Sequence, residues 1–286
     1  MGSLTFDVFV SDGPVRAGAQ RMPDGSPLVW NPLSTTLIVG EESAVLVDPP
    51  FTVQQIDAVA AWVEQSGKTL THIYATHGHG DHWFGGPALT ERFPTATLYA
   101  TKGTIEMMHK QSTVGREQLW DVIFPGQLPA TPVIAREVGP DGFELEGHRL
   151  LPIEVGHTDT DSTTVLHVPS LDLVVAGDSV YNGVHQYLIE GRDGGFARWL
   201  EALDVIEKLD AQFVVAGHKN RQLPDRPEAI EETRRYLSDV LALIDAHVTP
   251  EKFFQEMTTR YPDRLNQSPV WYGGLGLLGP STPAAS

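Results

Sequence analysis

The sequence contains no cysteine among its 286 residues. A chain without cysteine has no disulfide framework, no cysteine-ligated zinc finger and no cysteine nucleophile. If this protein binds a transition metal, histidine, aspartate and glutamate must therefore supply the ligands.

Basic residues are also scarce, because 20 Lys and Arg stand against 37 Asp and Glu and give a formal net charge of −17. A chain this acidic repels nucleic-acid phosphates and anionic membrane surfaces. We therefore expect no nucleic acid and no membrane as partner, and a small molecule as the substrate.

Long hydrophobic runs are absent as well, since no apolar segment approaches the length that spans a bilayer. The first residues lack the basic and apolar regions of a secretory signal. These two absences favour a cytoplasmic protein.

The most informative segment is 76–82, which reads Thr-His-Gly-His-Gly-Asp-His and follows an apolar run. Glycine spacers let the backbone turn sharply, so that imidazoles and a carboxylate can converge on one point. Imidazole suits zinc and similar metals, and a carboxylate adds an oxygen ligand. The segment therefore predicts a metal site that uses His77, His79, Asp81 and His82.

Apolar periodicity predicts strands paired as hairpins in some places and alternating with helices in others. This order favours one α/β domain over residues 1–286, built as a four-layer αβ/βα sandwich of two mixed β-sheets with outer helices. The expected strands are 4–11, 35–39, 44–47, 71–75, 97–100, 163–168, 173–176 and 213–216, with a further hairpin over 143–154. The expected helices are 53–65, 87–93, 102–110, 196–209, 227–247 and 250–261.

Two segments do not fit this alternation. Residues 111–135 form an insertion that is long for a connection, so it is either a substrate wall or a peripheral piece that packs on its own aromatic residues. After the C-terminal helices, which begin at about 227, residues 271–280 are uncharged and apolar. This tail packs on its own domain or across the boundary of a homodimer.

Four expected strands end in a polar residue that follows a small one. The polar residues are His77, His157, Asp178 and His218, and the small residues before them are Thr76, Gly156, Gly177 and Gly217. Strand ends are rigid places to mount ligands, and several of them can meet at one edge of a sheet. Together with the dense 76–82 segment, they form a specific constellation for a metal centre.

These residues, in this order and at these spacings, resemble the metallo-β-lactamase-fold metallohydrolases over roughly residues 30–220. Asp48, at the end of its strand, matches the first motif of that family. The resemblance implies that His77, His79 and His157 bind one metal, that Asp81, His82 and His218 bind a second, and that Asp178 bridges both. It also implies that Asp48 orients the ligand loop from behind.

The resemblance implies two divalent ions, with Zn²⁺ favoured and Mn, Fe or Co also compatible with His and Asp ligands. The family's chemistry uses a metal-bridging hydroxide, whose formation the ions favour by lowering the pKa of water. Asp81 is expected to orient this nucleophile or to pass a proton to the leaving group.

The surroundings of Asp178 favour one branch of the superfamily. Tyr181 lies three residues after Asp178, an arrangement similar to the N-acyl-homoserine lactone lactonases, in which that tyrosine points at the substrate carbonyl. We expect Tyr181 to stabilise the developing oxyanion. The expected apolar pocket wall consists of Trp83, Phe84, His185 and Tyr187.

The leading hypothesis is thus a dinuclear hydrolase that opens a lactone, ester or cyclic amide. A thioesterase of the glyoxalase II type remains open, although only Lys219 and Arg221 offer positive charge near a ligand corner. A mononuclear iron persulfide dioxygenase is the third possibility, and a non-catalytic metal-binding scaffold is the fourth. A count of bound metals separates a hydrolase, an oxygenase and a scaffold.

Overall fold

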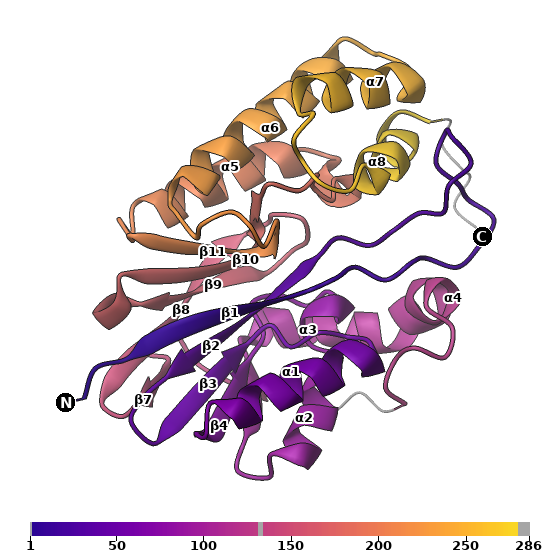
Figure 1. Cartoon of the computed structure of the whole chain (residues 1–286). Helices are drawn as coiled ribbons and strands as arrows, with labels where there is room; N and C mark the ends of the chain where they lie inside the picture. Colours follow the sequence, from indigo (N-terminus) through magenta and orange to yellow (C-terminus); the bar gives the residue numbers. More distant parts are fainter. Residues whose placement is uncertain (1, 131–133, 280–286) are drawn as a thin grey trace.

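The computed structural model describes residues 2–130 and 134–279. Its N-terminal half forms one half of a β-sandwich, with helices on the outer face (Figure 1). The strands are β1 (Thr5–Ser11), β2 (Leu33–Val39), β3 (Ser43–Val47), β4 (Thr69–Tyr74), β5 (Thr97–Ala100) and β6 (Arg136–Glu137), and the helices are α1 (Val53–Gln65), α2 (Gly86–Arg92) and α3 (Lys102–Lys110).

The C-terminal half repeats this arrangement on the opposite side (Figure 1). Its strands are β7 (Phe143–Leu145), β8 (His148–Gly156), β9 (Thr163–Val168), β10 (Leu173–Asn182) and β11 (Phe213–Lys219). Its outer helices are α5 (Gly195–Glu207), α6 (Glu228–Asp245) and α7 (Pro250–Arg260).

Side-chain alternation along the strands explains the layers, because successive residues of a strand face opposite sides. Leu46 packs in a core with helix α1, whereas its neighbours Val45 and Val47 face the space between the two half-sheets. In the other half, Val174 packs towards α5 and α6, and Val175 faces the same central space. Three hydrophobic cores thus separate four layers, which confirms the predicted fold class.

The two half-sheets are joined rather than separate. The hydrogen-bonded strand order is β6-β5-β4-β3-β2-β11-β10-β9-β8-β7, with β1 on β2. β2 and β11 meet at Leu33 and His218, so the sheet folds over at this pair and continues into the second half. The junction places a predicted metal ligand where the two halves touch.

Strand β10 is longer than the predicted segment 173–176, and Asp178 and Tyr181 lie within it. Its register with β11 shifts between Gly177 and Tyr181. Gly177 has a φ of +50°, and a Cβ there would lie 2.3 Å from the Thr76 hydroxyl oxygen. Asp178 therefore sits in an irregular part of β10 that lies against the ligand loop, and not beyond the end of a strand.

The 111–135 segment continues α3 as a wider π-type helix, Gln111–Trp120, followed by the short α4 (Asp121–Ile123). Trp120 packs on Trp30 at 5.4 Å and on Phe51 at 5.7 Å between ring centroids, and both partners lie outside the segment. Gln111, Leu119 and Trp120 line the cavity described below, so the segment contributes to a cavity wall. Residues 131–133 of the predicted insertion lie outside the described residues.

The apolar tail forms a helix, α8 (Ser268–Leu278), which the sequence interpretation did not predict. It packs on helix α7 of the same chain, where Trp271 and Phe254 have ring centroids 5.7 Å apart. Pro280 of the predicted tail segment lies outside the described residues.

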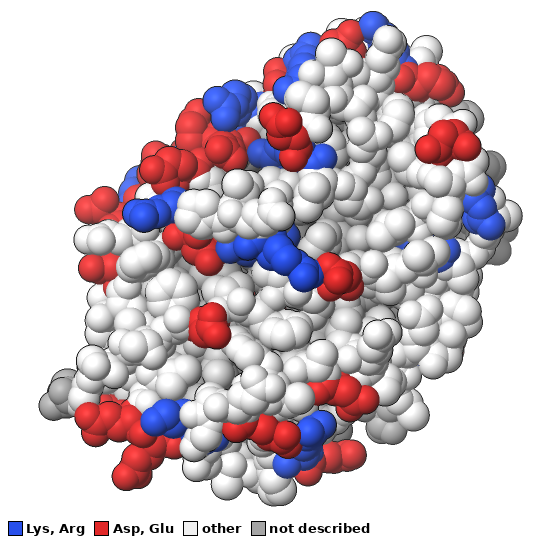
Figure 2. Space-filling model, viewed as in Figure 1, with Lys and Arg blue, Asp and Glu red and all other residues white. Residues whose placement is uncertain are grey.

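In the two described ranges, every helix is either too short or too polar to cross a membrane. Helix α6, with 18 residues, is among the longer helices and carries charged side chains along its length. Figure 2 shows many charged side chains over the outer helices at the top and along the lower edge, and fewer between them, where a short blue stretch and separate red groups lie among white residues.

Candidate metal centre

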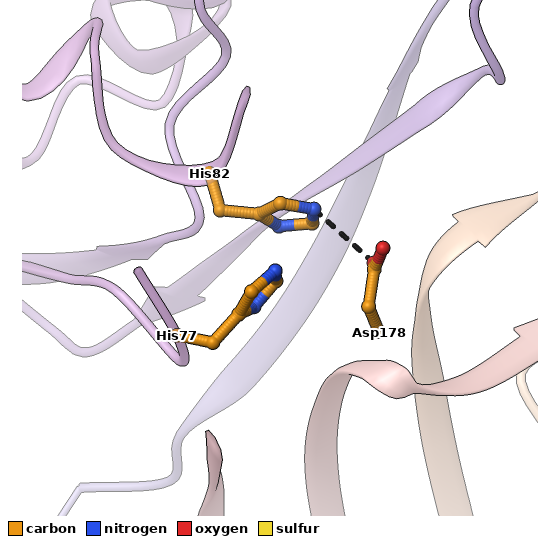
Figure 3. Close-up of side chains that lie close together, drawn as sticks. All are labelled: His77, His82 and Asp178. Atoms are coloured by element: carbon orange, nitrogen blue, oxygen red, sulfur yellow. Dashed lines mark ion pairs between the residues drawn. The ribbon is translucent and has the colours of Figure 1, made fainter. Parts of the chain in front are cut away.

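The ligand loop after β4, the irregular part of β10 and the end of β11 meet at one end of the sandwich. Figure 3 shows His77 and His82 from the loop pointing towards Asp178. The Nε2 atom of His82 lies 3.1 Å from Oδ1 of Asp178, and Nε2 of His218 lies 3.1 Å from Oδ2 of the same carboxylate. Asp178 thus presents its two oxygens to two imidazoles.

One candidate ligand group consists of Asp81, His82 and His218, whose donor atoms lie within 4.8 Å of one another. Oδ2 of Asp81 is 3.8 Å from His82 Nε2 and 3.4 Å from His218 Nε2. These residues are the ones that the family resemblance assigns to the second metal. The structure brings them together beside Asp178.

A second candidate group consists of His77, His79 and Asp159. Oδ2 of Asp159 lies 2.8 Å from His79 Nδ1 and 3.8 Å from His77 Nε2. His77 also forms a group with His82 and Asp178, so the two groups are contiguous. Asp159 takes the place that the sequence interpretation gave to His157.

His157, which the sequence interpretation assigned to this group, lies outside it in the structure. Its Nδ1 lies 2.6 Å from a carboxylate oxygen of Asp161, and its Nε2 lies 3.0 Å from the backbone carbonyl of Glu190. Both partners are acceptors, so the ring donates to at least one of them, and His157 belongs to none of the candidate ligand groups among the described residues.

The four histidines of the cluster are held differently, because each has one ring nitrogen on a neighbour and turns the other inwards. The outer contacts are hydrogen bonds for three of them: His77 Nδ1 with Thr76 Oγ1 at 3.0 Å, His79 Nε2 with Glu190 Oε1 at 2.9 Å and His218 Nδ1 with the Pro32 carbonyl at 2.9 Å. For His82 the outer contact is an ionic one, with Nδ1 3.2 Å from Asp48 Oδ2 and outside hydrogen-bond geometry. Such outer partners fix the tautomer and ring orientation of metal-binding histidines.

The inward-facing atoms fit a cation. Several are buried without a hydrogen-bond partner among the described residues: His77 Nε2, His82 Nε2, Asp159 Oδ2 and Asp178 Oδ1. Buried nitrogen and oxygen lone pairs are costly when nothing satisfies them. A divalent ion would satisfy these atoms, and imidazole with carboxylate is a donor set that such ions accept.

Asp48 supports the ligand loop from behind, and its placement matches the role expected for it. Its side chain accepts the backbone N–H of Thr76 at 2.8 Å and the Thr76 hydroxyl at 2.8 Å. Trp83 adds a second support, because its indole N–H donates to the Gly78 carbonyl at 2.9 Å.

The charges of the cluster are strongly coupled. Burial alone would raise the pKa of Asp178, but His218 and His82 hold it well below its usual range. Burial alone would lower the pKa of His218, but Asp178 and Asp81 raise it to about 9. The carboxylates thus recruit positive charge, which protons or metal ions can supply.

Tyr181 was expected to face the substrate carbonyl, but in the structure it is hydrogen-bonded to a candidate ligand and does not line the cavity. Its hydroxyl donates to Oδ2 of Asp178 at 2.7 Å, and its ring stacks on His218 with 5.6 Å between centroids. The phenol is fully buried, and the nearest strong acceptor is the Asp178 carboxylate. This tyrosine orients a candidate ligand instead of lining the cavity.

A cavity of about 310 Å³ opens beside the cluster. Its lining includes Asp81, Asp159 and Asp178, so the candidate ligands form its floor. Its walls are formed largely by aromatic and aliphatic side chains from distant segments: Trp30, Leu119, Trp120, Tyr187, Ile189, Tyr272 and Leu275.

Of the four predicted wall residues, Tyr187 lines this cavity and the others do not. Trp83 and Phe84 are buried in the core beneath helix α1. His185 is fully buried, with Nδ1 3.0 Å from the Tyr236 hydroxyl. Adjacency in sequence to the ligands was the signal for these residues, and the chain direction after each ligand turns them into the core.

Sequence reasoning missed several residues of the site. Trp30 donates its indole N–H to Oδ2 of Asp81 at 2.8 Å, and Arg16 lines the cavity. Glu190 holds His79, as described above. These three lie in loops far from any motif, so no local pattern marks them. Asp159 was visible within the Gly-His-Thr-Asp-Thr-Asp run, but spacing alone does not say which side chain faces inwards.

Comparisons with curated proteins identify hydroxyacylglutathione hydrolases as relatives. The protein from Rhizobium meliloti is 27% identical over 205 residues, which cover 66% of this chain and 68% of that protein. The protein from Xylella fastidiosa (strain 9a5c) is 38% identical over 69 residues, 24% of this chain and 25% of that protein. Sequence similarity to this second relative thus covers only about a quarter of its length.

Solved structures show the same fold. The metallo-β-lactamase FIM-1 from Pseudomonas aeruginosa, in its mono-zinc form, aligns with a TM-score of 0.56 at 17% identity, over 83% of this chain and 92% of that chain. The sequence profile of the metallo-β-lactamase superfamily matches residues 28–218, the segment that contains every candidate ligand. The chain therefore belongs to the metallo-β-lactamase superfamily and is a metal-dependent hydrolase.

Proposed function

We propose that this protein is a dinuclear metal hydrolase that opens a lactone, ester or cyclic amide with an apolar body. The observation that carries the proposal is the shared carboxylate. Asp178 faces His82 with one oxygen and His218 with the other, and it forms a candidate ligand group with His77 and His82. A carboxylate between two ligand groups suits two neighbouring cations, because its negative charge reduces their repulsion.

Buried charge supports two ions. Asp48, Asp81, Asp159 and Asp178 are each at most 3% exposed and lie around the same imidazoles. Burial of an unpaired carboxylate is strongly unfavourable, so the site needs several positive charges. Two divalent cations would balance four carboxylates.

When bound, divalent ions supply Lewis-acid activation of the substrate carbonyl and of water. The chain's own residues supply the rest. Tyr181 holds Asp178 through its hydroxyl, and Trp30 holds Asp81 through its indole N–H. Asp81 lines the cavity, and we assign it the role of orienting the nucleophile. Zn²⁺ is the first candidate ion, with Mn, Fe and Co as further candidates.

The cavity walls support an apolar substrate body. Two tryptophans and two tyrosines surround the space above the ligands, together with the aliphatic residues Leu119, Ile189 and Leu275. Aromatic and aliphatic walls bind apolar groups and exclude water from the reacting centre. A phosphodiester would bring a negative charge, shared by two oxygens, into this largely apolar space.

Arg16 provides one polar contact in this apolar environment. Its guanidinium lies 4.7 Å from the Tyr272 ring centroid and 5.8 Å from that of Trp30, and its Nε is buried without a hydrogen-bond partner among the described residues. A planar guanidinium held between rings can donate to a carbonyl or carboxylate of the substrate.

A thioesterase acting on a glutathione thioester is the second candidate, favoured by the similarity to the Rhizobium meliloti hydroxyacylglutathione hydrolase. Glutathione carries two carboxylates, and among the described residues Arg16 is the single Lys or Arg in the cavity lining. Lys219 is paired with Asp225, outside the cavity. The charge of the cavity therefore favours the lactone or ester over the glutathione conjugate.

The proposal is tested by metal analysis and a hydrolysis panel on the protein as expressed. We expect two metal equivalents per chain and faster turnover of acyl lactones and aryl esters than of S-lactoylglutathione, a β-lactam or a phosphodiester. A single iron per chain would favour the oxygenase alternative, and absence of metal would favour a scaffold. Preferential hydrolysis of S-lactoylglutathione would replace the lead proposal with the second.

A further inference from the structure

We infer that Asp159, and not His157, completes the first metal site, so that two imidazoles and one carboxylate hold this ion. The inference rests on the proposed metal-dependent function and deepens it. It departs from the three-histidine site that the family resemblance implied. Its consequences are a different dependence of metal binding on single residues and a different preference between ions.

The position of Asp159 is the first argument. Its side chain is 1% exposed, and Oδ2 points at the two inward-facing nitrogens of His77 and His79. The other oxygen, Oδ1, accepts the Thr158 hydroxyl at 3.0 Å. One oxygen is thus fixed by the protein, and the buried second oxygen remains without a hydrogen-bond partner in the described part of the chain.

The orientation of His79 is the second argument. Its Nε2 is 2.9 Å from Oε1 of Glu190, which fixes the proton on that nitrogen. Its Nδ1 is the atom 2.8 Å from Asp159 Oδ2. Because the carboxylate can only accept here, the contact needs either a second proton on Nδ1 or a cation shared by the two atoms, and a bound divalent ion would replace that proton.

The environment of His157 is the third argument. Its two ring nitrogens face the Asp161 carboxylate and the Glu190 carbonyl, both of which are acceptors. The ring occupies a recess that depends on Gly195, because a Cβ at Gly195 would lie 2.6 Å from His157 Nε2. His157 lines an outer groove with Asp161 and Lys110, and it does not line the cavity above the ligands.

The ligand change alters the charge of the site. A carboxylate in place of a neutral imidazole adds one negative charge and a hard oxygen donor. Carboxylate and water ligands suit Mn²⁺, whereas a site of imidazoles favours Zn²⁺ more strongly. We therefore expect the first site to accept Mn²⁺ more readily than a three-histidine site of the same geometry.

The test compares four single variants with the wild-type holoprotein by metal analysis and by titration of the metal-stripped proteins with Zn²⁺ and Mn²⁺. Asp159→Asn should lose one metal equivalent or weaken binding at the first site by at least about tenfold. His157→Gln and Asp161→Asn should keep both equivalents with unchanged affinity. Asp159→His should retain two Zn²⁺ equivalents and bind Mn²⁺ more weakly than the wild type.

The opposite pattern would overturn the inference. Loss of an equivalent in His157→Gln, or weaker metal binding in Asp161→Asn, would show that His157 is a ligand oriented by Asp161. Full retention of both metals by Asp159→Asn would equally contradict it. The melting temperatures of the metal-stripped proteins separate lost ligation from lost folding. A wild-type protein with fewer than two metals would instead count against the proposed function.

Discussion

Two turns at the edge of the sheet begin alike and differ in what they do. The ligand loop after β4 places His77 directly after Thr76, and the turn after β8 places His157 directly after Gly156. His77 faces the cluster with its Nε2 atom, while its Nδ1 atom contacts the Thr76 hydroxyl. His157 faces away, with both nitrogens on acceptors.

The difference shows that a strand end positions a histidine without deciding its direction. The direction depends on which hydrogen-bond partners the surrounding chain offers. Behind the ligand loop, Asp48 and Thr76 form a fixed set of acceptors. Beside the β8 turn, Asp161 and the Glu190 carbonyl draw the ring outwards, and Asp159 is left to face the metal centre.

The largest expected effect comes from the residue on which both ligand groups depend. Asp178→Ala should remove at least one metal equivalent and reduce kcat/KM by at least about 10²-fold, because even partners behind the ligands affect metal binding by 10–100-fold. Metal analysis and initial rates on the same preparation measure this. Asp245→Asn, an exposed aspartate of helix α6, is the control. Full activity with both metals in Asp178→Ala would refute the shared-carboxylate mechanism.

The acceptors behind the ligand loop give the next effect. Asp48→Asn places an amide where the Thr76 hydroxyl and His82 Nδ1 need an acceptor, so metal affinity should fall by about 10–100-fold. The measurement is Zn²⁺ titration of the metal-stripped protein. Asp48 has a φ of 54°, and the exposed Asp172 has a φ of 48°, so Asp172→Asn is a control matched in backbone conformation. Equal Zn²⁺ affinities of Asp48→Asn and Asp172→Asn would contradict a role of Asp48 in orienting the ligand loop.

The sequence predicts those parts of the fold that local patterns determine, and it does not predict those that depend on contacts between distant segments. Alternation in β3 and helical spacing in α1 are set by burial of side chains on one or two faces, so local pattern reveals them. The irregular part of β10 was not predicted, because Gly177 adapts to a contact with Thr76, about a hundred positions earlier. Helix α8 was also missed, since its uniformly apolar sequence carries no helical period.

For the site, dense local motifs are predictable and assembled walls are not. His77, His79, Asp81 and His82 lie within one short loop, so their convergence follows from the chain itself. The cavity lining takes Arg16 and Trp30 from the loop between β1 and β2, Glu190 from the segment after β10 and Tyr272 from α8. Figure 1 shows that loop passing beside α8. Such meetings depend on the completed fold, which no local spacing encodes.

A smaller effect, on substrate binding, is expected from substitution of Arg16 in the cavity wall. Arg16→Ala should raise KM for a substrate with a carbonyl or carboxylate by about 10–100-fold, because a charged hydrogen bond contributes about 1.5–3 kcal/mol. The turnover number should change little, since Arg16 lies above the ligands. Arg16→Lys should recover only part of the loss, because an ammonium lacks the planar fork. Arg21→Ala, in the same loop and exposed, is the control. An unchanged KM in Arg16→Ala would remove this contact from the binding site.

The smallest effect concerns a histidine that lies near the site but faces the core. Burial, with a smaller contribution from Arg264, lowers the pKa of His185 to about 3. This value lies below the 6.5 of an unfolded histidine, so the unfolded chain binds the extra proton between these two pH values. His185 therefore contributes stability that is present above about pH 6.5 and is lost as the pH falls, by up to about 1.4 kcal/mol per pH unit.

His185→Gln removes this titration and keeps a polar group near the Tyr236 hydroxyl. The variant should be less stable than the wild type at pH 7.5, by about 1 kcal/mol, and the gap should narrow or reverse towards pH 4.5. Urea unfolding of both metal-stripped proteins across this range gives the difference, in which the titration of the shared ligand cluster cancels. A gap independent of pH would mean that His185 is protonated without cost in the folded protein, and that its burial in the core is less complete than the packing against Tyr236 indicates.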